Sequence, residues 1–153
     1  MPEISEIAPD FTLPRDGSGE IQLTTLRPSP VVLFFYPRDD TPGCTTEAIG
    51  FTSLKPEFDA LNVQILGISK DTVAKHGKFR DKHSLGVPLL SDENDNVCEI
   101  YGVWKEKSMY GKKFFGIERS TFLIDGMGKI ARVWHRVKVP GHVEEVLEAA
   151  RAL

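Results

Sequence analysis

The chain has 153 residues, 41% of them hydrophobic and 27% charged, which is an ordinary composition for a soluble globular protein. Its formal net charge of -3 argues against nucleic acid as a main partner, because phosphate binding requires clustered positive charge. The amino-terminal residues lack the apolar core of a signal peptide, and no apolar run approaches the length of a membrane span, so no membrane partner is expected. We therefore expect a single domain over residues 1–153 in the reducing cytoplasm.

The first predicted elements are two short alternating strands at residues 11–13 and 21–23, separated by a polar turn that contains glycine. A wholly apolar run at residues 31–35 indicates a buried strand, and Pro37 ends it. The chain therefore opens with a β-hairpin that is followed by the first strand of a buried sheet.

A long helix is predicted at residues 42–60, where apolar side chains recur at helical spacing. Pro56 lies inside this stretch and is expected to divide it into two helices near Thr52. Further strands are predicted at residues 63–69, 87–90, 116–125 and 129–137, and further helices at residues 72–83, 93–101 and 142–153. The basic stretch at residues 105–113 is interpreted as a solvated loop, with an anion site as the alternative.

The order of these elements predicts an α/β fold. Helices that alternate with apolar strands imply a partly parallel sheet, and the hairpin centred on Gly126 to Gly128 adds antiparallel strands. We predict a mixed central sheet flanked by helices. The thioredoxin fold belongs to this class, but the pattern alone does not select it.

One of the two cysteines follows the buried strand in the stretch Y-P-R-D-D-T-P-G-C-T-T-E-A, residues 36–48. Thr41 is a good N-cap and Pro42 is favoured at the first helical position, which puts Gly43 and Cys44 in the first turn. Unpaired backbone N–H groups and the helix dipole favour negative charge there, so Cys44 is expected to react as a thiolate. Gly43 would allow a small substrate to approach the sulfur closely.

A buried structural cysteine is the alternative, since free cysteines are often core residues. A cysteine hydrolase would need a histidine beside Cys44, and nothing in the sequence places one there. The four histidines are interpreted as surface or hydrogen-bonded residues, with His76 and His83 on an exposed helix: His76, His83, His135 and His142. They lack metal-ligand spacing, so neither a metal nor a cofactor is predicted. A fixed cation is then needed to hold the thiolate.

The stretch P-R-D-D-T-P-G-C-T-T-E-A, together with the later M-Y-G-K-K-F-F-G-I-E-R-S-T-F-L-I-D, resembles a peroxiredoxin of the Q type, also called bacterioferritin comigratory protein. The resemblance runs from Ala8 to the last helix. It implies a thioredoxin-like fold with an amino-terminal β-hairpin. It also implies reduction of hydrogen peroxide and organic hydroperoxides by a peroxidatic cysteine, Cys44. Pro37, Thr41 and Cys44 match the family's active-site motif, and Arg119 matches its arginine.

The residue types suit this chemistry. Arg119 would stabilise both the thiolate and the charge that develops on the departing oxygen. The hydroxyl of Thr41 and the N–H groups of the first turn would hold the peroxide, and Pro37 would shield the sulfur from water. Glu47 follows Cys44 by one turn and either orients Arg119 or is an exposed helical glutamate.

The sequence departs from the resemblance in its second cysteine. Many Q-type members carry a resolving cysteine at a position matching Ile49 or Arg80, and both positions are empty here. Cys98 is placed at the margin of a short helix whose core face carries Val97, Ile100 and Tyr101, so it is not expected to resolve efficiently.

We therefore expect one-cysteine recycling by an external thiol, such as glutathione, thioredoxin or a glutaredoxin. The protein would be a monomer or a weak dimer. A slow bridge between Cys44 and Cys98 and an intermolecular disulfide are the alternatives for recycling. The alternative function is a redox-inactive binding or chaperone module on the same fold.

Overall fold

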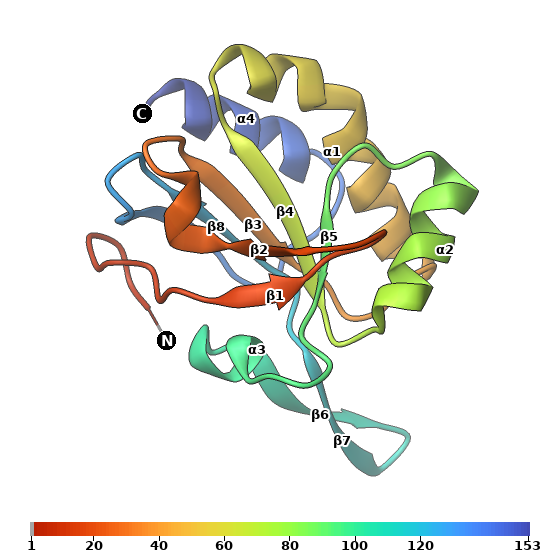
Figure 1. The fold of residues 1–153 in the computed structure, drawn as a ribbon. Helices are drawn as coiled ribbons and strands as arrows, with labels where there is room; N and C mark the ends of the chain where they lie inside the picture. Colours follow the sequence, from red (N-terminus) through yellow and green to blue (C-terminus); the bar gives the residue numbers. More distant parts are fainter. Residues whose placement is uncertain (1) are drawn as a thin grey trace.

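A computed structural model describes residues 2–153 and is built around one five-stranded sheet (Figure 1). The strand order is β5–β4–β3–β8–β9, in which β3, β4 and β5 run parallel while β8 and β9 pair antiparallel. The bounds of these strands are β3 Val31–Phe35, β4 Gln64–Ser69, β5 Leu89–Ser91, β8 Ser120–Ile124 and β9 Ile130–Trp134. The prediction of a mixed central sheet is therefore confirmed.

Helices cover one face of this sheet, and the amino-terminal hairpin lies on the other (Figure 1). The helices are α1 Pro42–Ala60, α2 Val73–His83, α3 Val97–Ile100 and α4 His142–Arg151. Helices α1, α2 and α4 contribute to one core cluster, while α3 packs in the cluster on the opposite face. Within residues 2–153, no helix combines the length and the apolarity that crossing a membrane would require.

Strand β3 is central because its two sets of side chains enter two cores. Val31, Leu33 and Phe35 face the cluster beneath the hairpin, whereas Val32 and Phe34 face the helices. A strand that is covered on both faces has no side exposed to solvent. Its sequence is therefore a continuous apolar run and does not alternate between apolar and polar residues. The end of this strand delivers the chain to residues 37–41 and then to α1.

The hairpin on the other face consists of β1 (Thr12–Pro14) and β2 (Glu20–Gln22), followed by a short 3-10 turn, η1 (Leu23–Leu26). Gly17 and Gly19 both have a φ of +83°, a conformation that side chains rarely adopt, which explains the glycine-containing turn. The predicted amino-terminal β-hairpin is confirmed.

Helix α1 is continuous, so the prediction that Pro56 divides it is wrong. Proline removes one helical hydrogen bond. Phe51 and Phe58 lie on either side of Pro56, and both are fully buried against the sheet. Burial of two large aromatic side chains offsets the lost hydrogen bond, because each buries enough apolar surface to contribute about 2 kcal/mol or more.

Residues 105–113 form a hairpin where a loop was expected, and this part of the prediction is wrong. Strands β6 (Trp104–Met109) and β7 (Lys112–Ile117) pair antiparallel and extend from the body of the molecule (Figure 1). The two turn residues, Tyr110 and Gly111, have φ angles of 53° and 77°, as a two-residue hairpin turn requires. The exposed lysines concealed the strand pattern in the sequence.

Helix α3 is shorter than predicted, and a different face of it packs against the core. Ile100 is 45% exposed, while Cys98 is fully buried, so Cys98 lies in the core and Ile100 does not. The carboxylate of Asp92 accepts hydrogen bonds from the backbone N–H groups of Val97 and Cys98. This cap fixes the start of the helix and turns the Cys98 side chain inward.

Candidate active site

Cys44 lies in the first turn of α1, at the end of the loop that follows β3. Thr41 is the N-cap, with φ -94° and ψ 155°, and Pro42 is the first helical residue, as predicted. The hydroxyl of Thr41 donates to the carbonyl of Arg38 at 2.9 Å and does not cap the helix. This bond leaves the lone pairs of the Thr41 oxygen free to accept a hydrogen bond from a ligand. The Cys44 side chain is almost completely buried.

Arg119 reaches this turn from the segment between β7 and β8. Its Nη2 donates to Sγ of Cys44 at 3.3 Å, and its Nη1 donates to Oε1 of Glu47 at 2.8 Å. A β-carbon at position 43 would lie 3.1 Å from the same Nη2, so the bare backbone of Gly43 makes room for the guanidinium. The geometry thus brings Cys44, Gly43 and Arg119 together, as the sequence predicted.

Glu47 is buried, which excludes the interpretation as an exposed helical glutamate. Burial raises the pKa of this carboxyl to about 7, and the attraction of Arg119 opposes that rise. Its Oε2 is buried and has no hydrogen-bond partner among residues 2–153. A buried carboxyl with one free oxygen therefore sits directly behind the guanidinium that contacts the sulfur.

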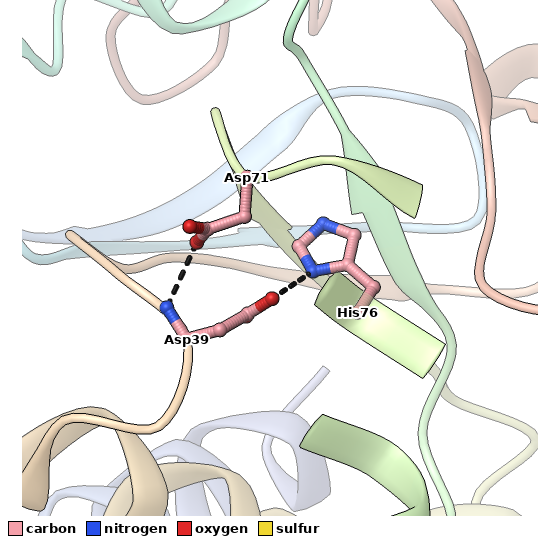
Figure 2. Close-up of side chains that lie close together, drawn as sticks. All are labelled: Asp39, Asp71 and His76. Atoms are coloured by element: carbon pink, nitrogen blue, oxygen red, sulfur yellow. Dashed lines mark hydrogen bonds and ion pairs between the residues drawn. The ribbon is translucent and has the colours of Figure 1, made fainter. Parts of the chain in front are cut away.

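A buried network fixes the loop before Cys44 (Figure 2). The backbone N–H of Asp39 donates to Asp71 at 2.8 Å, and Nδ1 of His76 lies 2.7 Å from the carboxylate of Asp39. Tyr36 donates its hydroxyl to the other oxygen of Asp39 at 2.7 Å, and Nε2 of His76 lies 2.9 Å from the carbonyl of Leu90. The loop is therefore joined to the connection between β4 and α2, to α2 itself and to β5 before it reaches the first turn of α1.

Comparisons with known proteins identify the family of the chain. Residues 4–133 match the model of the AhpC/TSA family. The chain belongs to the AhpC/TSA family. Within it, the chain is a peroxiredoxin of the Q type: it is 50% identical to a putative peroxiredoxin bcp of Coxiella burnetii, over 95% of this chain and 96% of that protein. It is 44% identical to peroxiredoxin Bcp of Bacillus subtilis, over 97% and 95% of the two chains.

Solved structures give the same result for the fold. Xylella fastidiosa PrxQ superposes with a TM-score of 0.94 at 40% identity, covering 99% of this chain and 97% of that one. The bacterioferritin comigratory protein of Xanthomonas campestris, for which alkyl peroxide reduction activity is described, gives a TM-score of 0.88 at 43% identity over 93% and 90% of the chains. The fold is thioredoxin-like, and the chain is an enzyme of the thiol-dependent peroxidase class.

Among residues 2–153, no hydrogen bond joins a histidine to Cys44. His76 is fully buried, so the prediction of an exposed position was wrong. Its spacing of three residues from buried Phe79 was the signal that the two side chains share the inner face of α2. His142 is also buried, and burial lowers its pKa to about 4, so it is neutral near pH 7.

Among the described residues, Asp39, Asp71 and His76 form a group whose possible metal-ligand atoms all lie within 4.8 Å of one another (Figure 2). Each of them already has a hydrogen-bond partner inside the group or next to it. Both ring nitrogens of His76 lie against oxygen atoms of the protein, one of Asp39 and one of Leu90. The residues present fit a hydrogen-bonded anchor for the loop better than a set of free metal ligands.

The remaining predicted residues lie around the site or away from it. Pro37 is exposed at the start of the loop. Ile49, one of the two usual resolving positions, is 41% exposed on α1. Arg80, at the other position, donates to the buried carboxylate of Asp16 at 2.5 Å and ties α2 to the amino-terminal hairpin.

Cys98 lies on the opposite face of the sheet from Cys44. It packs in the cluster that contains Leu33 and Phe35, whereas Cys44 packs with Val32 and Phe34. Both cysteines are free thiols. Burial, reinforced by the neighbouring Asp92, raises the pKa of Cys98 far above its usual range. Cys98 is therefore a poor nucleophile in the folded protein.

Proposed function

We propose that Cys44 is the peroxidatic residue of this thiol-dependent peroxidase. The 3.3 Å hydrogen bond from Arg119 to Sγ of Cys44 carries the proposal, because it joins a fixed cation to a thiol in the first turn of a helix. The sulfur attacks one peroxide oxygen, the O–O bond breaks, and Cys44 becomes a sulfenic acid. The other oxygen leaves as an alcohol or water once it has been protonated.

Four residues would bind and orient the hydroperoxide. Arg119 stabilises the negative charge as it moves from the sulfur to the departing oxygen. Fixed hydrogen-bond donors of this kind lower the energy of the transition state. The hydroxyl of Thr41 accepts from the peroxide, the backbone beside Gly43 offers first-turn N–H groups, and Pro37 limits the approach of water. The half-buried positions of Thr41 and Gly43 support this arrangement, because a ligand can reach them from solvent.

The substrates we propose are hydrogen peroxide and organic hydroperoxides. The alkyl peroxide reduction activity of the Xanthomonas campestris relative supports the second class. We propose that an external thiol then reduces Cys44, with glutathione, thioredoxin or a glutaredoxin as the candidate reductants. The position of Cys98 beyond the sheet supports external recycling.

The rest of the proposal concerns the setting in which the enzyme works. We propose that the chain acts as a single domain, as a monomer or a weak dimer, in the cytoplasm. Two free cysteines suit a reducing compartment. The alternative, a redox-inactive binding module, is not favoured, because such a module has no need for an arginine held against a buried thiol.

Peroxide consumption by two variants tests the proposal. Cys44→Ser should abolish peroxidase activity with a small thiol reductant, while Cys98→Ser should leave the rate of the first oxidation within about two-fold of wild type. Cys44 should also be alkylated faster than Cys98 at about pH 6, because Arg119 donates to the Cys44 sulfur while burial raises the pKa of Cys98. Full activity in Cys44→Ser would remove Cys44 from the reaction.

A further inference from the structure

Glu47 and Cys44 lie on the same helix and share one guanidinium. Nη1 of Arg119 donates to Oε1 of Glu47 at 2.8 Å, and Nη2 of the same residue donates to Sγ of Cys44 at 3.3 Å. The Glu47 side chain is fully buried, and its Oε2 has no hydrogen-bond partner among residues 2–153. A buried oxygen without a hydrogen-bond partner costs more free energy as part of an ionised carboxylate than as the O–H of a neutral carboxylic acid.

Among residues 2–153, Arg119 is the cation that hydrogen-bonds to Glu47 and to Cys44, and no second cation does so. Lys107 on β6 is a second positive charge in this neighbourhood, but its ammonium donates to the carbonyl of Ile117 at 2.6 Å. Burial and repulsion from Arg119 lower the pKa of Lys107, and attraction to Glu118 and Cys44 opposes that fall. His142 at the start of α4 is neutral near pH 7, since burial lowers its pKa to about 4. The neighbouring acids Glu144 and Glu145 are exposed and act on His142.

One close cation therefore faces two acids in a largely buried setting. If both acids were ionised, the group would carry a net negative charge with little access to water, which costs several kcal/mol. If only one is ionised, Arg119 neutralises it. Two acids that interact this closely titrate as a pair, so the charge of one depends on the state of the other.

We propose that Glu47 and Cys44 share one proton across Arg119: Glu47 is a carboxylic acid while Cys44 is a thiolate, and it becomes a carboxylate once the sulfur has been oxidised. The inference rests on the proposed role of Cys44. Glu47 acts through Arg119 and is a positioning residue, since nothing places it against the reacting oxygens.

The step balances without any further reactant. The Cys44 thiolate forms a bond to one peroxide oxygen, the O–O bond breaks, and sulfur loses two electrons to the peroxide. In the net reaction, the proton of Glu47 is released as the departing oxygen takes one up, which yields the sulfenic acid, an alcohol or water, and the Glu47 carboxylate. Arg119 is paired with one anion before the step and with one anion after it.

The pH range of the effect follows from the charges. Burial raises the pKa of Glu47 to about 7 when its only charged partner is Arg119, and a thiolate at Cys44 raises that pKa further. At a pH between these two pKa values of Glu47, its carboxyl is protonated when Cys44 is a thiolate and ionised when Cys44 is a sulfenic acid. We therefore expect the coupling near pH 7.5 and its loss near pH 6, where Glu47 stays protonated in both states.

Proton uptake during a single oxidation tests the inference. The full chain is mixed with one equivalent of hydrogen peroxide in weak buffer containing a pH indicator, and the thiolate absorbance and the sulfenic acid formed are measured on the same sample. Oxidation of an uncoupled thiolate takes up about one proton from solvent, because hydroxide leaves. We expect uptake near zero per thiolate consumed in wild type at about pH 7.5, and about one in Glu47→Gln.

A matched control is available on the same helix. Glu57 is exposed on α1, so Glu57→Gln removes a carboxylate and should leave the stoichiometry at the wild-type value. Uptake of about one proton in wild type at every pH, equal to that of Glu47→Gln, would overturn the inference. Failure of the proposed function is a distinct outcome, since no sulfenic acid would then form on Cys44 in any of the proteins.

The wild-type chain alone keeps the inference testable if Glu47→Gln does not fold. Uptake per thiolate should fall from about one near pH 6 to near zero near pH 7.5. A flat profile over that range, with thiolate present throughout, would mean that Glu47 keeps a fixed charge.

Discussion

The guanidinium of Arg119 lies over the backbone of Gly43, so closely that a β-carbon at position 43 would come within 3.1 Å of Nη2. The same nitrogen donates to the sulfur of Cys44 at 3.3 Å. The absence of a side chain at position 43 therefore decides how near the positive charge comes to the nucleophile. No strained backbone is involved, because the φ of Gly43 is not positive.

Gly43→Ala should separate stability from catalysis. Alanine is favoured over glycine in a helix by about 0.5 to 1 kcal/mol, so the variant should be at least as stable as wild type. Its methyl group displaces the guanidinium from the sulfur, so the second-order rate with peroxide should fall by about ten-fold. Stopped-flow measurement of sulfenic acid formation gives that rate.

The control for this change is Gly77→Ala on α2, where the added β-carbon meets nothing within 4 Å. It should bring a similar helical stabilisation with an unchanged rate. A wild-type rate in Gly43→Ala would mean that the guanidinium tolerates displacement.

Arg119→Lys tests the fork of the guanidinium. Lysine keeps the charge but cannot present two fixed donors to Cys44 and Glu47 at once. We expect the second-order rate with peroxide to fall by about ten- to a thousand-fold, as it does when one preorganised donor is removed. Arg136→Lys is the control, because the Arg136 side chain is 88% exposed and pairs only with Glu118. Equal losses in the two variants would contradict a special role for Arg119.

His76→Leu should destabilise the fold. Its ring contacts the buried carboxylate of Asp39 and the carbonyl of Leu90, and removing one partner of a buried pair leaves the other uncompensated. We expect the free energy of unfolding in urea to fall by about 3 kcal/mol. His83→Leu, which removes a partly exposed contact with Asp40, should cost less than about 1 kcal/mol. Similar losses in both variants would show that the network around Asp39 is not the anchor of the loop.

Stability should depend on His142 below neutral pH. Burial lowers the pKa of folded His142 from 6.5 to about 4, so the unfolded chain takes up its proton first as the pH falls. This contribution is complete above about pH 6.5 and is lost as the pH falls toward 4, by at most about 3 kcal/mol in total.

Glu47 acts in the opposite sense over an overlapping range. Its pKa is raised from 4.5 to about 7, so its burial costs stability as the pH rises through that interval. The difference between wild type and His142→Gln therefore isolates the histidine. From about pH 7 to pH 4, the free energy of unfolding of wild type should fall relative to that of His142→Gln, and a constant difference between the two proteins would contradict the assignment.

Much of the site could be predicted from local sequence signals. Thr41, Pro42 and Gly43 define the start of a helix by their own conformational preferences, so the position of Cys44 in the first turn follows without tertiary information. Arg119 was found through the resemblance to a family, because its contact with Cys44 spans 75 residues of sequence. No local rule reports such a contact.

The errors have a common cause in tertiary packing. Pro56 stays inside α1 because buried side chains on both sides of it hold the helix to the sheet. Cys98 turns inward because Asp92, six residues earlier, caps α3. His76 can be buried because its ring is hydrogen-bonded to the carboxylate of Asp39, which lies in another loop. Each case depends on a partner that propensity and periodicity do not include.

Cys98 should not form a disulfide with Cys44 in the folded enzyme. The two side chains belong to cores on opposite faces of the sheet, and a disulfide requires Cα atoms within about 7 Å. One equivalent of peroxide without reductant should therefore leave a sulfenic acid on Cys44 that dimedone traps, and excess peroxide should convert it to sulfinic acid.

Intact mass spectrometry distinguishes the two routes of recycling. The oxidised chain should gain oxygen, and the lifetime of its sulfenic acid should be the same in Cys98→Ser, because the buried thiol with its raised pKa does not attack. A bridge would require local unfolding of α1 or α3, which costs less than global unfolding but is slow relative to capture by an external thiol. Rapid loss of two hydrogens, with a peptide linking Cys44 to Cys98, would show that this opening occurs and that the enzyme resolves its own sulfenic acid.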